Sequence, residues 1–208
     1  MARVARHTMR AVPLEGAERT HAAILLAAGA SQRMGSPKAL LAWRGTTLLA
    51  YTVGQLRAAG VDQLVVVLGL AHEQIRQQVP ELHGATVALN LDEASGRSGS
   101  IRIGASALPD EVGRVLVQSV DQPCSAAVLK ALYAADATVA VPTFEGRRGH
   151  PVCFSGSVLS ELRQVSEETE GLRAVVRRHP VTMVAVTDAW VTWNLNDPQT
   201  YADAVRSI

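Results

Sequence analysis

The chain has 208 residues, of which 48% are apolar, so one domain with a sizeable core is expected. Its formal net charge of +1 argues against a broad nucleic-acid or membrane surface, and no apolar run approaches the ~20 residues of a membrane helix. The two cysteines, Cys124 and Cys153, form no CxxC pair and no metal-ligand spacing, which predicts a reduced, cytoplasmic protein.

The first 21 residues contain several arginines, Glu15 and Glu18, but no apolar segment typical of a secretory signal. We therefore predict a disordered tail over residues 1–21 and a folded domain over residues 22–208. No internal repeat or low-complexity linker divides that domain.

Apolar runs alternate with helical patterns over the first two thirds of the chain. Strands are predicted at 22–27, 64–69, 86–89 and 114–120. Helices are predicted at 47–59, 72–79, 98–108 and 125–134. This alternation indicates crossover connections and a mostly parallel sheet with helices on both faces.

From residue 139 the rhythm changes. Strands are predicted at 139–142, 152–154 and 181–186, with a turn at 146–149, and helices at 157–164, 171–178 and 198–206. The whole pattern predicts an α/β fold: a single Rossmann-like three-layer domain whose sheet is mostly parallel, with a C-terminal antiparallel portion.

The loop after the first strand, residues 28–38, is rich in Gly, Ser and Pro and contains Arg33 and Lys38. Glycines let backbone N–H groups approach phosphate oxygens, and the two cations add charge-assisted hydrogen bonds. An ordinary strand-to-helix turn with solvated cations fits the spacing equally well. The loop matches neither GxxxxGK[ST] nor GxGxxG.

Asp121 ends the apolar run 115–120, so it belongs at the carboxyl edge of the sheet, where open α/β sheets bind ligands. A carboxylate there suits Mg²⁺, which prefers hard oxygen ligands. A simple turn or helix-capping role beside Ser125 is the other reading of the same residue.

Five segments together resemble the MobA-like nucleotidyltransferases, in that family's order and over residues 22–206. They are Leu26-Ala27-Ala28-Gly29-Ala30-Ser31-Gln32-Arg33-Met34-Gly35-Ser36-Pro37-Lys38, Gly96-Arg97-Ser98-Gly99-Ser100-Ile101, Asp121-Gln122-Pro123, Arg148-Gly149-His150-Pro151 and Asn194-Leu195-Asn196-Asp197-Pro198. The resemblance implies Mg²⁺-dependent nucleotidyl transfer from a nucleoside triphosphate to a phosphorylated acceptor.

The resemblance also implies roles for particular residues. The catalytic residues are expected to be Lys38, Arg33 and Asp121. Nucleotide binding is expected from Leu26, Ala27, Ala28, Gly29, Ser31, Arg33, Lys38, Ser98 and Ser100. Metal binding falls to Asp121, Asn194 and Asn196, and acceptor binding to Arg148, Gly149 and His150.

Simpler roles stay open for three of these segments. Ser98 and Ser100 fit the N-terminus of a helix as capping residues as well as anion ligands. The basic turn around Arg148 also reads as a hairpin tip. Many family members carry Asp where this chain has Asn194 and Asn196, and those two residues also fit a turn before the last helix.

Within the resembled family, loops reading Ala-Ala-Gly favour CTP, so residues 27–29 imply a molybdenum cofactor cytidylyltransferase. Its acceptor would be molybdopterin and its partner a molybdenum hydroxylase. Two alternatives are an NAD(P)H-dependent oxidoreductase of a small quinone-like or dye-like compound and a non-catalytic carrier of the cofactor. The absence of GxGxxG argues against the oxidoreductase.

Overall fold

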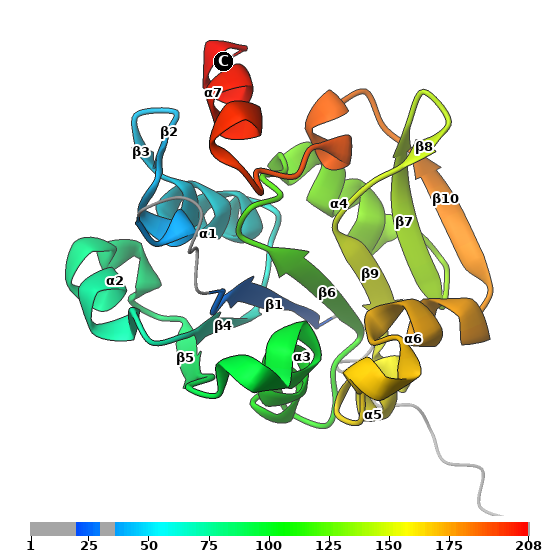
Figure 1. Cartoon of the computed structure of the whole chain (residues 1–208). Helices are drawn as coiled ribbons and strands as arrows, with labels where there is room; N and C mark the ends of the chain where they lie inside the picture. The colour runs from blue at the N-terminus through cyan, green and yellow to red at the C-terminus, as the bar shows by residue number, and fades with distance from the viewer. Residues whose placement is uncertain (1–19, 30–35, 208) are drawn as a thin grey trace, which may run out of the picture.

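The computed structural model describes residues 20–29 and 36–207 (Figure 1). Residues 1–19 of the predicted tail, and the loop residues Ser31 and Arg33, lie outside these ranges. The first strand, β1 (His21–Ala27), begins one residue before the predicted start at 22. The division into a tail and one domain stays a prediction.

An eight-stranded sheet forms the centre of the molecule, in the order β10-β7-β9-β6-β1-β4-β5 with β8 paired to β7. Its further strands are β4 (Gln63–Leu68), β5 (Thr86–Leu89), β6 (Arg114–Ser119), β7 (Val139–Phe144), β8 (Arg147–Arg148), β9 (Val152–Ser155) and β10 (Val181–Ala185). β9 runs antiparallel to both neighbours, whereas β10 pairs in parallel with β7. The predicted mostly parallel sheet with a C-terminal antiparallel portion is confirmed.

Helices cover both faces of this sheet, which confirms the predicted three layers (Figure 1). One face packs against α1 (Leu48–Ala58) and α4 (Ala126–Ala134), and the other against α3 (Gly96–Ser106), α5 (Leu159–Leu162) and α6 (Leu172–Arg178). Two further helices, α2 (His72–Gln78) and α7 (Pro198–Arg206), each contribute one buried residue to the α1 side.

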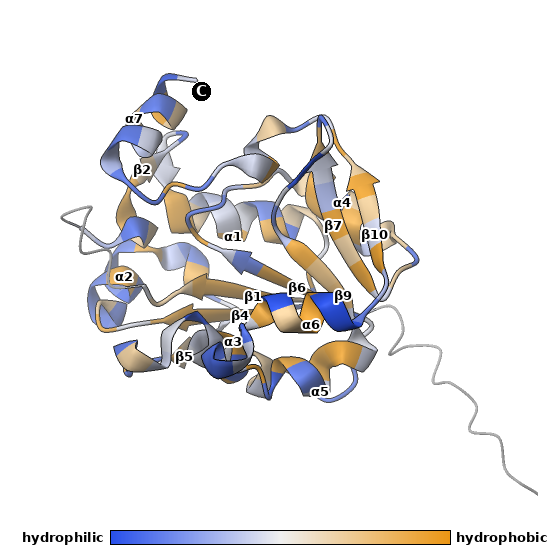
Figure 2. Cartoon of the chain, turned by 45° about the vertical axis from the view of Figure 1, so that its right-hand side comes forward, coloured by the Kyte–Doolittle hydropathy of each residue, from blue (hydrophilic) through white to orange (hydrophobic). Residues whose placement is uncertain are grey.

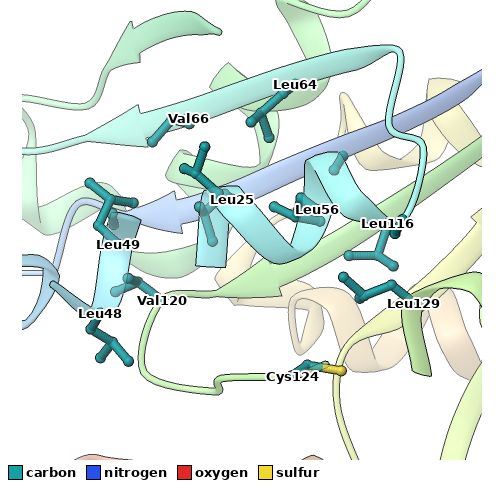
Figure 3. Packing of buried hydrophobic residues seen from close by; sticks show 14 of the residues in the cluster. Leu25, Leu48, Leu49, Leu56, Leu64, Val66, Leu116, Val120, Cys124 and Leu129 are labelled. Carbon is teal, nitrogen blue, oxygen red and sulfur yellow. The ribbon is translucent and has the colours of Figure 1, made fainter. Parts of the chain in front are cut away.

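The central strands β1 and β4 are almost entirely apolar because both of their faces are buried, whereas the edge strands β5 and β10 are partly exposed. Along β1, Ala23 and Leu25 face the α1 side, while Ala22 and Ile24 face the α3 side. Figure 3 shows Leu25 packed among leucines of α1, and Figure 2 shows the apolar colour gathered on the central strands. Among the described residues, no helix combines the length and apolarity that crossing a membrane requires.

Local signals explain where α1 begins and ends. Thr47 caps α1 by accepting a hydrogen bond from the Ala50 N–H at 3.1 Å, and Gly60 follows the helix with φ +85°. The β2–β3 hairpin (Ala42–Trp43 and Thr46–Thr47) was not predicted, because two-residue strands leave no periodic pattern.

Candidate functional site

A cleft of about 450 Å³ lies where four parallel strands end. β4, β1 and β6 are hydrogen-bonded neighbours and β5 borders β4, so their carboxyl ends meet at one edge of the sheet. The residues that follow the four strand ends line the cleft: Ala28, Gly29, Gly69, Asn90, Asp121 and Gln122.

Lys38 lies inside this cleft between two oxygen atoms. Its Nζ donates to Asp121 Oδ2 at 2.8 Å and to Asn196 Oδ1 at 2.8 Å. The Lys38 and Asp121 side chains are 18% and 17% exposed, so water reaches the pair only partly. Three segments far apart in the sequence therefore meet at one cation.

The backbone around Asp121 holds the third segment in place. The Leu195 N–H donates to the Asp121 carbonyl at 2.8 Å, and buried Leu195 anchors this segment in the α1-side core. Asp197 then caps α7 by accepting from the Thr200 N–H at 2.8 Å. The segment from Asn194 is thus both the turn into the last helix and part of the cleft wall.

The oxygen atoms that surround Lys38 Nζ are of the kind that hard divalent cations prefer. One carboxylate and one amide oxygen point at a single cationic position, and Asn194 lines the cleft beside them. No group of three or more His, Cys, Asp or Glu able to hold a metal occurs among the described residues. The donor set therefore fits an ion that takes most of its ligands from phosphate and water.

Ser100 lines the cleft, but its hydroxyl is held by a buried network. Asn90 Nδ2 donates to Ser100 Oγ at 2.9 Å, and Asn90 Oδ1 accepts from Ser95 Oγ at 3.1 Å. This network joins the end of β5 to the start of α3, so it shapes the cleft wall between them.

Ser98 does not reach the cleft, contrary to the expectation that it donates to an anion there. Its side chain is buried, and its backbone N–H donates to Glu167 Oε1 at 2.8 Å. That hydrogen bond lowers the pKa of Glu167. The anion at the α3 N-terminus is thus the carboxylate of Glu167, which lies 69 residues after Ser98 in the sequence.

Arg97 lines the cleft, although the sequence analysis assigned it no role. Its side chain is exposed to the cleft. The surrounding protein nevertheless desolvates the guanidinium and lowers its pKa, while the negative charges of Asp121 and Glu167 act to raise it. A cation in the first turn of a helix interacts unfavourably with the helix dipole. That unusual position is the feature of the sequence that could have pointed to Arg97 as a cleft residue.

The three residues of the basic turn predicted to bind the acceptor do not line the cleft. Arg148 is exposed in β8, at the hairpin with β7. A side chain on Gly149 would come within 2.5 Å of the Val191 carbonyl oxygen, so packing accounts for this glycine. His150 is partly buried; burial and then Arg97 lower its pKa, while Asp121 opposes them.

Most of the expected site residues within the described ranges line this one cleft. Those lining the cleft are Leu26, Ala27, Ala28, Gly29, Lys38, Ser100, Asp121, Asn194 and Asn196. Those that do not line it are Ser98, Arg148, Gly149 and His150. The chemical roles of all these residues stay predictions.

Comparison with known proteins gives a family match over most of the chain. Residues 23–183 match the family model described as a MobA-like NTP transferase domain. This range includes β1 from Ala23 onward, the described part of the glycine loop, Asp121 and the basic turn.

Two curated relatives differ in how much of them this chain covers. The bifunctional protein GlmU of Mycobacterium ulcerans (strain Agy99) is 39% identical over 109 residues, which are 49% of this chain and 22% of GlmU. The chain therefore spans about a fifth of that relative's length. The nicotine blue oxidoreductase of Paenarthrobacter nicotinovorans is 30% identical over 168 residues, covering 76% of this chain and 81% of that protein.

Solved structures resemble the chain over nearly its whole length. The crystal structure of Rv0371c from Mycobacterium tuberculosis H37Rv has a TM-score of 0.80 and 29% identity, covering 91% of this chain and 100% of that one. A second structure of Rv0371c, in complex with manganese, has a TM-score of 0.78, 28% identity and the same coverage of both chains.

Proposed function

The chain belongs to the MobA-like NTP transferase family, and from this premise we propose that it transfers a nucleotide from a triphosphate to a phosphorylated acceptor. An acceptor phosphate oxygen attacks the α-phosphorus, and the bond to the leaving pyrophosphate breaks. The observation that carries the proposal is the meeting of Lys38, Asp121 and Asn196 in the cleft beside Gly29. A phosphate nucleophile is already ionised, so no general base is required.

Charge neutralisation and positioning are what this reaction asks of the protein. Lys38 is proposed to bind the β- and γ-phosphates, with Ser31 and Arg33 of the glycine loop completing the cradle. The amide groups that follow β1 are proposed to add hydrogen bonds to the triphosphate, because Ala28 and Gly29, which have a small or no side chain, line the cleft there.

Asp121, Asn194 and Asn196 are proposed to hold a divalent cation, Mg²⁺. The fit of their oxygen atoms and the manganese complex of Rv0371c, a relative of 28% identity, support this assignment. When bound, the ion would neutralise charge on the α-phosphate and orient it for in-line attack. Lys38 must then release Asp121 and Asn196 and turn to the phosphates.

The substrate pair is proposed to be CTP and molybdopterin, in a cytoplasmic enzyme serving a molybdenum hydroxylase. The support for CTP is the Ala27-Ala28-Gly29 loop, which lines the cleft. On the acceptor side, His150 lies close enough to Asp121 and Arg97 for their charges to affect its pKa. Arg148 and Gly149 belong to the same turn, and they are proposed to contribute to acceptor binding by positioning it.

A second candidate is an NAD(P)H-dependent oxidoreductase of a small dye-like compound. It is favoured by one observation, the nicotine blue oxidoreductase of Paenarthrobacter nicotinovorans, 30% identical over most of both chains. The lack of GxGxxG beside β1 opposes it.

Thermal-shift titration with CTP, GTP and NADPH, each with and without Mg²⁺, separates the candidates. Stabilisation by CTP that requires Mg²⁺ is the expected result, and K38M should reduce it. The matched control is K130M, since Lys130 is the one other lysine and lies exposed on α4. A metal-independent shift with NADPH alone would establish the oxidoreductase, and no shift with any ligand would favour the carrier.

A further inference from the structure

Resting on the proposed function, we propose that Arg97 binds the phosphate group of the acceptor, at a subsite separate from the triphosphate cations. The subsite would take a phosphate monoester, the group that performs the attack. Arg97 lines the same cleft as Asp121, so a phosphate held there lies beside the proposed metal ligand.

Arg97 lacks the structural partners that other arginines near α3 have. Arg102 donates to the Val165 carbonyl at 2.8 Å, and Arg163 donates to the Leu108 carbonyl at 2.9 Å. Within residues 20–29 and 36–207, no hydrogen bond or ion pair holds the Arg97 guanidinium. Its five N–H donors therefore remain available to a ligand.

The position of Arg97 is unfavourable for its positive charge, because the surrounding protein desolvates the guanidinium. It occupies the second position of α3, where the dipole of the helix disfavours a positive charge. Glu167 offsets part of this cost by accepting from the Ser98 N–H. Departures from local preference of this kind concentrate at functional sites.

The charge balance near Arg97 suits a dianionic group. Asp121 is already neutralised by Lys38, and Glu167 is engaged by Ser98. Arg173 of α6 does not line the cleft, but its charge acts on Arg97 and disfavours a second unneutralised cation there. An arginine fork that meets a phosphate makes two parallel charge-assisted hydrogen bonds.

His150 connects Arg97 with the turn that the family resemblance assigns to the acceptor. The Arg97 charge acts on His150, whose backbone N–H donates to the Val191 carbonyl at 2.7 Å. Lys38, by contrast, follows the glycine loop, on the side assigned to the triphosphate. The proposal therefore assigns the two cations to two different phosphates.

An NMR titration with inorganic phosphate at constant ionic strength tests the subsite. R97Q should weaken phosphate binding about tenfold or more, since it removes two charge-assisted hydrogen bonds. R97K, which keeps the charge but not the fork, should be intermediate. R76Q removes the same charge from the exposed surface of α2 and should bind phosphate like the wild type.

The double variant K38M/D121N removes the ion pair without changing net charge, and it should retain phosphate binding. CTP·Mg²⁺ titrations of the same proteins should show the reverse: binding lost in K38M/D121N and kept in R97Q. Unchanged phosphate affinity in R97Q, or no saturable phosphate binding by the wild type, overturns the proposal. Equal loss of CTP·Mg²⁺ affinity in R97Q also overturns it, by assigning Arg97 to the nucleotide.

Failure of the proposed function has a different signature. The wild type would then bind no nucleotide with Mg²⁺, while phosphate binding still depended on Arg97. Where transfer activity is present, R97Q should raise the KM for the acceptor and leave the KM for the triphosphate unchanged.

Discussion

At the scale of single residues, the ion pair of Lys38 and Asp121 organises the cleft. Both side chains are partly exposed, so the pair contributes modestly to folding stability. Its larger effect is on the arrangement of the cleft. The Lys38–Asp121 pair, hydrogen-bonded to Asn196, keeps three separate segments in contact in the absence of a ligand. The proposed function requires ligand binding to break these contacts.

If the proposed function holds, Asp121→Asn should slow pyrophosphate release on the order of a hundredfold or more, because the amide removes the anion proposed to hold the metal. Its melting temperature should change by only a few degrees, because the lost ion pair is partly exposed. A coupled pyrophosphate assay and a thermal melt measure the two quantities. Asp110→Asn, at an exposed ion pair with Arg163, is the control. An Asp121→Asn protein of full activity would remove the metal assignment.

At the scale of elements, α3 begins where a distant segment supplies its capping group. Gly96 has φ +60°, and Glu167 accepts from the Ser98 N–H. Gly171 packs on the same spot, where an added side chain would lie 3.0 Å from Ser98 Oγ. The 167–171 segment therefore fixes the start of α3 and the position of Arg97.

Glu167→Gln should lower the free energy of unfolding at pH 7 by up to about 1 kcal/mol, since the carboxylate is exposed. The hydrogen bond from Ser98 lowers the pKa of Glu167 below its ordinary 4.5. A lowered pKa means that this stabilisation is present above pH 4.5 and is lost as the pH falls through the folded-state pKa.

Denaturant unfolding at pH 7 and at stepwise lower pH measures both effects. The variant should lose less stability than the wild type as the medium is acidified. Glu111→Gln, at an exposed residue outside the helices and strands, is the matched control. Identical pH profiles for wild type and Glu167→Gln would show that the contact contributes nothing.

Two glycine substitutions should act in opposite directions. Gly149→Ala would bring Cβ within 2.5 Å of the Val191 carbonyl oxygen, so we expect a loss of about 1–3 kcal/mol. Gly54→Ala lies inside α1 with no atom within 4 Å, so we expect a gain of about 0.5–1 kcal/mol. Urea unfolding of both proteins is the measurement. A destabilised Gly54→Ala or a neutral Gly149→Ala would contradict the packing described.

At the scale of the whole molecule, both cysteines lie in the core between the sheet and the α1–α4 layer. Burial raises the pKa of the Cys153 thiol to about 11 and also raises the pKa of Cys124. A thiol reagent can reach them only when the helical layer separates from the sheet.

Labelling with a thiol reagent at pH 8 should therefore follow global unfolding. We expect negligible reaction in native buffer and two modified thiols per chain beyond the urea midpoint. CTP with Mg²⁺ should shift the labelling midpoint upward if it binds the native state. Fast labelling of either cysteine in native buffer would indicate local opening of this layer.

Periodicity and turn residues were sufficient for nearly every strand and helix. β1, β4 and β6 are buried on both faces, so their apolar runs are continuous and easy to find. The two-residue strands β2 and β3 were not predicted, because they form by pairing with each other and leave no local sequence pattern. The parallel pairing of β10 with β7 likewise depends on a contact between distant segments.

The amino-acid sequence by itself determined the alternation of strands and helices, and with it the sheet edge that carries Gly29 and Asp121. Only the tertiary structure decided which polar groups meet there. It put Lys38 on Asp121 and Asn196, turned Ser98 away toward Glu167 and left Arg97 in the cleft. The physical reason is the range over which each effect acts along the chain. Backbone preferences depend on a few neighbouring residues, whereas a charged side chain pairs with any polar group that the fold brings within a few ångströms.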